Sequence, residues 1–467
     1  MLKKLGENKV NIESAIVKMG DAQFPSPFAG GLEYSSPARG TWNIVHTGML
    51  VPEAHEIFVC AASCLRGVVL TAAEMNAMDR FSTVEVKENN LLEGNLEELL
   101  IDGVTDIINK LPKTPPAVLV YTSCVHHFTG CDWNVMFGTL RERFPDIDFV
   151  DCYMNPTLRK SGLTPDQIMR RQLYALLKPC SINPNSAAII GNDLPTDRNS
   201  DLIKMLEAYG IKIHEITSCK TYAEYQQMAE SSIYISYYPA AKAGGEELAK
   251  RLGGKHLYLP YSWDYDEIDE TLKTLTAVCE DMVKDSETIA GENSRSSENT
   301  IDKFFAQKKA ECEKAFRETY EIIGDTPIAI DYTFCPRPTS VAKQLLTHGF
   351  NVKRIYLDSF TREEKGDYEF LKENCPDLEL YATVNVMSRF MAHDTGTDNE
   401  KWLAIGQKAA YFLNTDYFVN VVEGGGMFGY EAVTDGLKLI REAFLEKKEM
   451  RKLVQIKGMG CGSCGLG

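Results

Sequence analysis

The sequence predicts an α/β protein made of doubly wound parallel-sheet domains in series. Short apolar runs alternate with helical patterns along most of the chain, which is typical of βαβ units. The 467 residues also exceed what one hydrophobic core usually holds, so we expect roughly two to four domains. Cysteine-rich segments follow two of the early strands, where open α/β sheets bind ligands.

The alternation is clearest in the middle of the chain. From residue 185, "SAAIIG" predicts a strand and "DRNSDLIKMLEAYG" a helix that ends at Gly210, because glycine is favoured just past a helix C-terminus. The segments "IKIHEIT", "SIYISYY" and "KHLYLP" predict further strands, with helices in "TYAEYQQMAES" and "AGGEELAKRLGG". After a polar stretch and a long helix, the same pattern restarts at "PIAIDYT".

These patterns divide the chain into five expected segments. They are a first α/β domain (1–184), a second Rossmann-like domain (185–283), a linker with a long helix (284–323), a third Rossmann-like domain (324–450), and a tail rich in Gly and Cys (451–467).

Composition excludes several classes of protein. The net charge of −16 argues against nucleic-acid or anionic-membrane partners, since both select a basic face. No apolar run approaches the roughly 20 residues that span a bilayer. The two N-terminal lysines precede no apolar segment, so we expect no signal peptide and a cytoplasmic location. In that compartment, disulfides poorly explain the 13 cysteines.

Four cysteines follow predicted strands. "FVCAASCLRG" carries Cys60 and Cys64, and in the first turn of a helix this spacing would put both sulfurs on one face. "VYTSCVHHFTGCDW" opens after its strand into a predicted loop with Cys124 and Cys131. Two thiol pairs in one domain favour a metal or cluster site, because Fe–S clusters take about four thiolates. The alternatives are a disulfide and ordinary buried thiols.

Other polar residues flank these cysteines. His126 and His127 have two interpretations: proton donors to a bound substrate, or packed polar side chains beside the sulfur site. Asp132 has two interpretations, a cluster ligand or the N-cap of a helix that starts at Trp133, and we expect the cap. The tail "GMGCGSCGLG" carries Cys461 and Cys464. Their spacing suits two ligands of one iron or zinc, and the alternative is a labile dithiol in an exposed tail.

The same segments resemble a known family. "YTSCVHHFTGCDW" resembles the strand–Cys–loop–Gly-Asp-Asp segment of nitrogenase component 1 proteins, and "FVCAASCLRG" is similar to their earlier Gly-Cys element, with Cys64 as the better match to its Cys. "IGQKAAYFLNTDYFVNVVEGGGMFGYEAVTDGLKLI" resembles their third-domain ending. The resemblance implies three Rossmann-like doubly wound domains and an iron–sulfur cluster, of [4Fe–4S] type, with Cys124 as a ligand.

Departures from the family pattern adjust this expectation. Cys131 replaces the first Asp of the Gly-Asp-Asp, and no Cys stands near residues 35–40, where the family has its first cluster ligand. We therefore expect Cys60, Cys64, Cys124 and Cys131 to hold the cluster. Ser236 and Phe428 stand where the resemblance places the Cys and His that anchor the molybdenum–iron cofactor. We expect neither that cofactor nor dinitrogen reduction.

The chain contains no G-x-x-x-x-G-K-[ST] motif and thus no P-loop of its own. The resemblance implies a separate ATP-binding iron protein as electron donor, and a homodimer, or a heterodimer or tetramer with a related component 1 subunit. The expected function is the iron–sulfur subunit of a nitrogenase-like two-component reductase with an unidentified substrate. The alternatives are a non-catalytic metallocluster assembly scaffold or carrier, and a cluster-free sugar- or nucleotide-binding protein.

Overall fold

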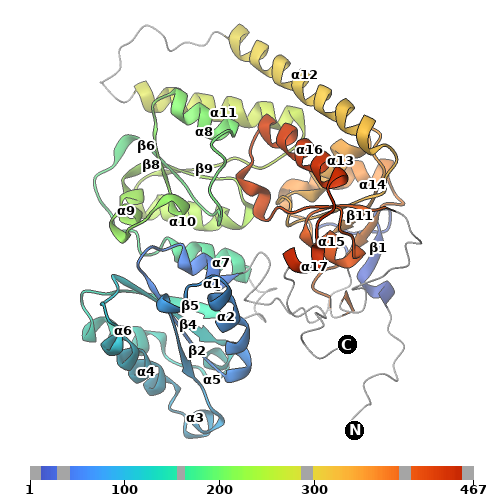
Figure 1. Ribbon diagram of the computed structural model, residues 1–467. Helices are drawn as coiled ribbons and strands as arrows, with labels where there is room; N and C mark the ends of the chain where they lie inside the picture. The colour runs from blue at the N-terminus through green and yellow to red at the C-terminus, as the bar shows by residue number, and fades with distance from the viewer. Residues whose placement is uncertain are drawn as a thin grey trace, which may run out of the picture. The chain divides into compact units, whose positions relative to one another are not determined.

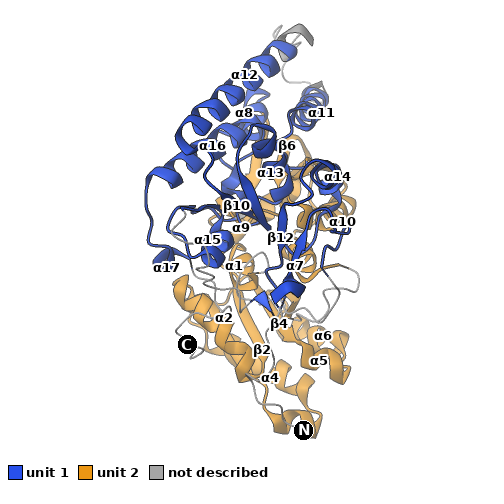
Figure 2. Ribbon diagram, turned by 90° about the vertical axis from the view of Figure 1, so that its right-hand side faces the viewer, with its two compact units in different colours: residues 1–34, 196–210, 260–467 blue, residues 35–195, 211–259 orange. Residues whose placement is uncertain are grey.

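A computed structural model describes residues 12–28, 43–154, 163–284, 298–385, 387–388 and 401–454. The chain forms two compact units (Figure 2): unit 2 comprises residues 35–195 and 211–259, and unit 1 the remainder. Unit 2 contains two four-stranded sheets and unit 1 a six-stranded sheet. Among the described strands, every pairing is parallel except that of β1 with β12. The predicted α/β fold with parallel sheets is confirmed, and the predicted domain boundaries remain a prediction.

The first sheet of unit 2 has the order β3-β2-β4-β5. Its strands are β2 (His55–Cys60), β3 (Phe81–Glu85), β4 (Ala117–Ser123) and β5 (Asp148–Met154). β2 and β4 are buried along their whole length, as expected for parallel strands with helices on both faces. The helices around this sheet are α1 (Ile44–Met49), α2 (Ala62–Glu74), α3 (Glu88–Glu93), α4 (Leu96–Lys110), α5 (Cys124–Thr129), α6 (Trp133–Arg143) and α7 (Pro165–Leu173) (Figure 1).

Two hydrophobic cores lie on opposite faces of this sheet. On one face, α1, α2 and α7 pack against Phe58, Cys60 and Tyr121. On the other, α4 and α6 pack against Ile57 and Val120. Side chains of successive strand residues alternate between the faces, so Cys60 belongs to the first core.

The second sheet of unit 2 repeats this order as β7-β6-β8-β9. Its strands are β6 (Asn183–Ile189), β7 (Lys212–Glu215), β8 (Ser231–Ser236) and β9 (Lys255–Tyr258), with helices α9 (Tyr222–Gln227) and α10 (Lys242–Leu252). Gly253 ends α10 in the left-handed conformation, as the sequence predicts. The two sheets of unit 2 share one hydrophobic core, which includes Phe58 from the first sheet and Tyr234 from the second.

The sheet of unit 1 has the order β1-β12-β11-β10-β13-β14. Its strands are β1 (Ile16–Lys18), β10 (Ile328–Asp331), β11 (Val352–Tyr356), β12 (Glu379–Tyr381), β13 (Leu403–Ile405) and β14 (Phe418–Val419). The parallel part has the Rossmann order 3-2-1-4-5. β1 was not predicted, because a strand of three partly exposed residues leaves no periodic pattern in the sequence.

The described part of unit 1 also contains eight α-helices. They are α8 (Asp201–Ala208), α11 (Tyr265–Lys284), α12 (Glu298–Ile323), α13 (Pro338–Thr347), α14 (Lys365–Asn374), α15 (Gln407–Leu413), α16 (Tyr430–Leu445) and α17 (Met450–Leu453). The long α12 packs against α16 (Figure 1). Among the described helices, none is both long and apolar enough to cross a membrane.

A buried ion pair fastens α7 to the second sheet of unit 2. Arg170, only 3% exposed, donates from Nη1 to Asp193 Oδ1 at 2.5 Å and from Nη2 to Asp193 Oδ2 at 3.0 Å. Nη1 also donates to the Gly191 carbonyl at 2.6 Å. Gly191 has a φ of +87°, and a Cβ at this position would collide with Ala241. The loop after β6 therefore requires glycine where it meets both the arginine and the short 3₁₀ helix η7 (Pro239–Ala241).

We predict that Asp193→Ala destabilises the protein by about 3 kcal/mol, because it removes both of the carboxylate oxygens that pair with the Nη atoms of the buried Arg170. Among the described residues, this leaves Asp166, 3.2 Å from Nε, as the remaining ion-pair partner of Arg170. Urea unfolding followed by circular dichroism measures this change. The matched control is Asp106→Ala, which removes an exposed pair with Lys110 and should cost less than about 0.5 kcal/mol. Equal effects of the two substitutions would contradict the role given to Arg170.

Candidate functional site

Three of the predicted cysteines lie at the carboxyl edge of the first sheet. Cys60 is the last residue of β2, Cys64 lies in the first turn of α2, and Cys124 begins α5 directly after β4. β2 and β4 pair in parallel, with Val59 opposite Thr122, so both strands end at the same edge. The strand order reverses between them, and this switch point is where open α/β sheets bind ligands.

The three thiols are close enough to interact electrostatically. Burial raises the pKa of the Cys60 thiol, and the neighbouring Cys64 and Cys124 raise it further. Burial, followed by the charge of Cys64, raises the pKa of Cys124. Cys60 is buried, Cys124 partly buried and Cys64 exposed. The metal-free site therefore keeps the Cys60 and Cys124 thiols protonated at neutral pH, and a metal would have to displace those protons.

Local structure differs from the sequence prediction at two points. Cys60 and Cys64 do not share one helical face, because Cys60 still pairs with Glu85 in the sheet and α2 begins at Ala62. The loop expected after β4 is instead helical over α5, which ends at Gly130 with a φ of +73°. Cys124 thus occupies the first position of a short helix.

Cys131 and Cys60 pack on different faces of the first sheet. The Sγ of Cys131 lies 3.4 Å from Thr129 Oγ1, and its side chain packs against the core formed by α4 and α6. Cys60 belongs to the core on the opposite face of the sheet. The next residue ties this turn to α4, since the Asp132 backbone N donates to Glu97 Oε1 at 2.6 Å. The role of Cys131 as a fourth ligand remains a prediction.

Asp132 caps α6, as the sequence predicts. Its Oδ1 accepts hydrogen bonds from the backbone N of Asn134 at 2.8 Å and of Val135 at 3.2 Å. This satisfies two of the donors that the first turn of a helix leaves unpaired.

His126 and His127 lie on α5 with different surroundings. His126 is fully buried, and its Nδ1 accepts from the Ser123 backbone N at 3.3 Å, so the ring proton is on Nε2. Burial lowers the pKa of His126 to about 4, and the ring is neutral at physiological pH. The ring of His127 lies 4.7 Å from that of Trp133 and 5.2 Å from that of Tyr153. These contacts favour the packed-residue interpretation over proton donation.

The donor set consists of thiols, the ligand type that iron–sulfur clusters take. Within the described ranges, no three His, Cys, Asp or Glu side chains converge as ligands of one metal ion. A multi-iron cluster binds its thiolates at different irons, so these sulfurs stand farther apart than the ligands of one ion. Thiolates are soft ligands that suit iron–sulfur clusters, whereas Mg²⁺ and Ca²⁺ prefer oxygen. Cys60, Cys64 and Cys124 therefore fit an iron–sulfur cluster.

Several predicted positions lie outside the described residues. They are the stretch 35–40 and both tail cysteines, Cys461 and Cys464.

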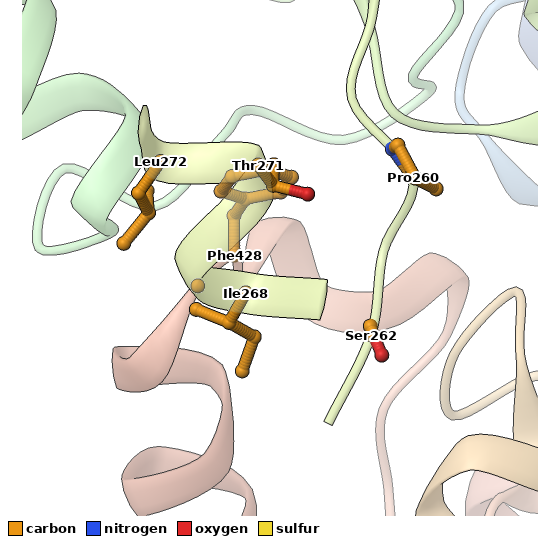
Figure 3. A pocket seen from close by; sticks show the side chains of 7 residues that line it. Pro260, Ser262, Ile268, Thr271, Leu272 and Phe428 are labelled. Atoms are coloured by element: carbon orange, nitrogen blue, oxygen red, sulfur yellow. The ribbon is translucent and has the colours of Figure 1, made fainter. Parts of the chain in front are cut away.

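Ser236 ends β8, and its Oγ lies 2.8 Å from His256 Nε2. Phe428 is buried beside a cavity of about 10 Å³ (Figure 3), room for about one water molecule.

Glu56, which was not among the predicted site residues, is a fully buried carboxyl group in β2. Neither of its oxygens has a hydrogen-bond partner among the described residues. Burial raises its pKa well above the usual range, because burial disfavours the charged form of a carboxyl group. Gly48 leaves room for it, since a Cβ there would collide with Glu56 Oε1. The sequence indicates this residue by a lone acidic side chain inside the apolar run "HEIFVC".

We predict that metal-free protein reacts with iodoacetamide faster at Cys64 than at Cys60. Cys64 is exposed, whereas Cys60 is buried with a raised pKa, and only an accessible thiolate reacts. Fragment-ion mass spectrometry separates the two sites. The exposed Cys180 and the buried Cys152 are the matched controls for fast and slow labelling. Equal rates at Cys60 and Cys64 would contradict the described site.

Comparisons with known proteins agree with this fold. The sequence profile described as "Nitrogenase component 1 type Oxidoreductase" matches residues 47–316. The solved structure of nitrogenase Cp1 at pH 6.5 is similar, with a TM-score of 0.61 and 11% identity over 94% of this chain and 96% of that chain. Nitrogenase Cp1 at pH 5 gives 0.57 and 12% over 96% of each. Comparison with curated proteins gives no match.

At these identities the solved structures establish likeness of fold alone. The profile match establishes the family, because residues 47–316 are more than half of the 467 residues. The matched range also contains the three grouped thiols. The chain belongs to the family of nitrogenase component 1 type oxidoreductases.

Proposed function

We propose that this chain is the iron–sulfur subunit of a nitrogenase-like two-component reductase. The observation that carries the proposal is the grouping of Cys60, Cys64 and Cys124 at the switch point of the first sheet. Such an edge is where α/β folds place ligands, and thiolates are the ligands of iron–sulfur clusters.

In this proposal each thiol has a distinct task. Cys60 holds the buried side of the site, where the stacked rings of Phe58 and Tyr121, 4.2 Å apart, keep water out of the sheet. Cys124 presents its sulfur from the start of α5, and Cys64 closes the exposed side. A bound [4Fe–4S] cluster would supply low-potential electron storage. Cys131 as the fourth ligand is supported by the sequence pattern.

Two kinds of protein partner complete the proposal. An ATP-binding iron protein would supply electrons, since the printed sequence has no P-loop. A second component 1 subunit, identical or related, would cover exposed apolar side chains near the thiols. Phe128 is 76% exposed, four residues after Cys124, and Leu70 of α2 is 41% exposed. Aromatic side chains such as that of Phe128 are enriched at subunit contacts relative to the rest of a protein surface.

The substrate is proposed to be something other than dinitrogen. Ser236 and Phe428 occupy the positions that the family resemblance gives to the molybdenum–iron cofactor's Cys and His anchors. A serine hydroxyl and a phenyl ring are poor replacements for a thiolate and an imidazole as metal ligands. The same loss of anchors supports the second candidate, a non-catalytic scaffold or carrier of metalloclusters, which the Cys461–Cys464 pair also favours.

We predict that anaerobically purified protein contains iron and sulfide. Cys124→Ala and Cys64→Ala should each lower iron content about tenfold or more, since even residues outside the ligand set change metal affinity by 10–100-fold. Cys180→Ala removes an exposed thiol away from the site and should leave iron content unchanged. A colourless wild-type protein with less than about one iron per chain would contradict the proposal.

Cys131→Ala tests the fourth ligand in the same assay. If Cys131 is a ligand, iron content falls as in Cys124→Ala. Unchanged iron content would leave three thiols from this chain, and the remaining coordination position would belong to another group.

We predict multiple turnovers when a cognate ATP-dependent iron protein and substrate are supplied. Loss of turnover without ATP, with cluster reduction followed by electron paramagnetic resonance, supports the reductase. Reduction of the cluster without turnover, together with transfer of iron to an acceptor protein, would support the scaffold instead.

A further inference from the structure

The sheet of unit 1 has a polar cluster at its own switch point. Its strand order reverses between β10 and β13, so ligands are expected at the carboxyl ends of these strands. Three residues meet there: Tyr332 directly after β10, Thr383 two residues after β12, and Lys408 in the first turn of α15. We call Tyr332, Thr383 and Lys408 the unit 1 triad.

A buried carboxylate fixes the two loops that carry Tyr332 and Lys408. Asp331, fully buried, accepts hydrogen bonds from the backbone N of Thr333 and of Ala409, both at 2.6 Å. Gly406 passes against this carboxylate with a φ of +120°, and a Cβ there would collide with it. Rigid loops of this kind hold a binding site in one geometry without cost at the moment of binding.

The hydrogen bonds of the unit 1 triad determine which proton can serve a ligand. Thr383 Oγ1 donates to Asp358 Oδ2 at 2.5 Å, and a hydroxyl has one proton to give. Lys408 Nζ donates to the Tyr332 hydroxyl oxygen and to Thr383 Oγ1, the latter at 3.1 Å. The hydroxyl proton of Thr383 is therefore already donated to Asp358. The Lys408 ammonium donates two of its protons to the other two members of the triad.

The proton of Tyr332 is held less tightly. Among the described residues, its hydroxyl has one further oxygen in reach, Thr383 Oγ1 at 3.3 Å. That separation exceeds the usual 2.7–2.8 Å of an O–H···O bond. An ammonium that donates to a phenol oxygen also polarises its O–H bond, which makes the hydroxyl a stronger donor. Tyr332 and Lys408 are both partly exposed, so a ligand can reach them.

We propose that the unit 1 triad binds a ligand through a carbonyl oxygen, which accepts the Tyr332 proton in a hydrogen bond strengthened by Lys408. The triad presents donors, so an acceptor group complements it. The carboxylates of Asp331 and Asp358 lie beside the Lys408 ammonium and would repel an anion, so a neutral acceptor such as a carbonyl oxygen suits the site. This site lies in unit 1 and does not depend on the proposed iron–sulfur site in unit 2, so loss of iron leaves it testable.

Fluorine NMR on full-length protein labelled with 3-fluorotyrosine tests the inference, with cyclohexanone as the carbonyl probe. Tyr332→Phe identifies the Tyr332 signal. We expect cyclohexanone to shift this signal saturably, and Lys408→Met to weaken binding about tenfold, because charge-assisted hydrogen bonds are roughly twice as strong as neutral ones. Lys408→Arg should restore part of the affinity.

Tyr417 is the matched control, since Lys401 lies 4.0 Å from its ring centroid. Its signal should not move with cyclohexanone, and Lys401→Met should leave the Tyr332 response intact. A Tyr332 signal that does not saturate, or that responds equally in Lys408→Met, would overturn the inference.

Discussion

Parallel pairing of β2 with β4 is the constraint on which the thiol site depends. Two adjacent parallel strands must end at the same edge, and their connecting helices leave toward opposite sides at a switch point. Cys60 and Cys124 stand at those two ends, so the sheet rather than a binding loop brings them together. Cys64 follows because the helix after β2 starts two residues later.

The switch points of the first sheet and of the unit 1 sheet carry different kinds of side chain. The first sheet ends in thiols, Cys60 at the end of β2 and Cys124 directly after β4. The sheet of unit 1 ends in the Asp331 carboxylate, which accepts from backbone N–H groups, and in the Lys408 ammonium, which donates to the Tyr332 phenol oxygen. Soft sulfur ligands and hydrogen-bond donors are suited to different ligands. A repeated architecture thus carries separate chemistry at separate edges.

The sequence was most informative where structure is local and periodic. Apolar runs and glycine caps predicted the parallel sheets, and Asp132 was correctly expected to cap α6. The family resemblance singled out Cys124 as a ligand candidate, and this residue directly follows a buried strand. The positions of side chains within turns could not be predicted, because they depend on a few backbone angles. Gly130, with a φ of +73°, sends the chain around so that Cys131 packs against α4 and α6.

Long-range pairing was beyond the reach of sequence patterns, and β1 shows a further consequence. Ile16 pairs with Tyr381, so this edge of the unit 1 sheet cannot form until the ribosome has released the chain well past β12. Pairings so distant in sequence are slow to close. Until β1 docks, β12 offers an open strand edge to other chains. During synthesis, β1 therefore stays unpaired until β12 has been made, whereas unit 2 can fold earlier.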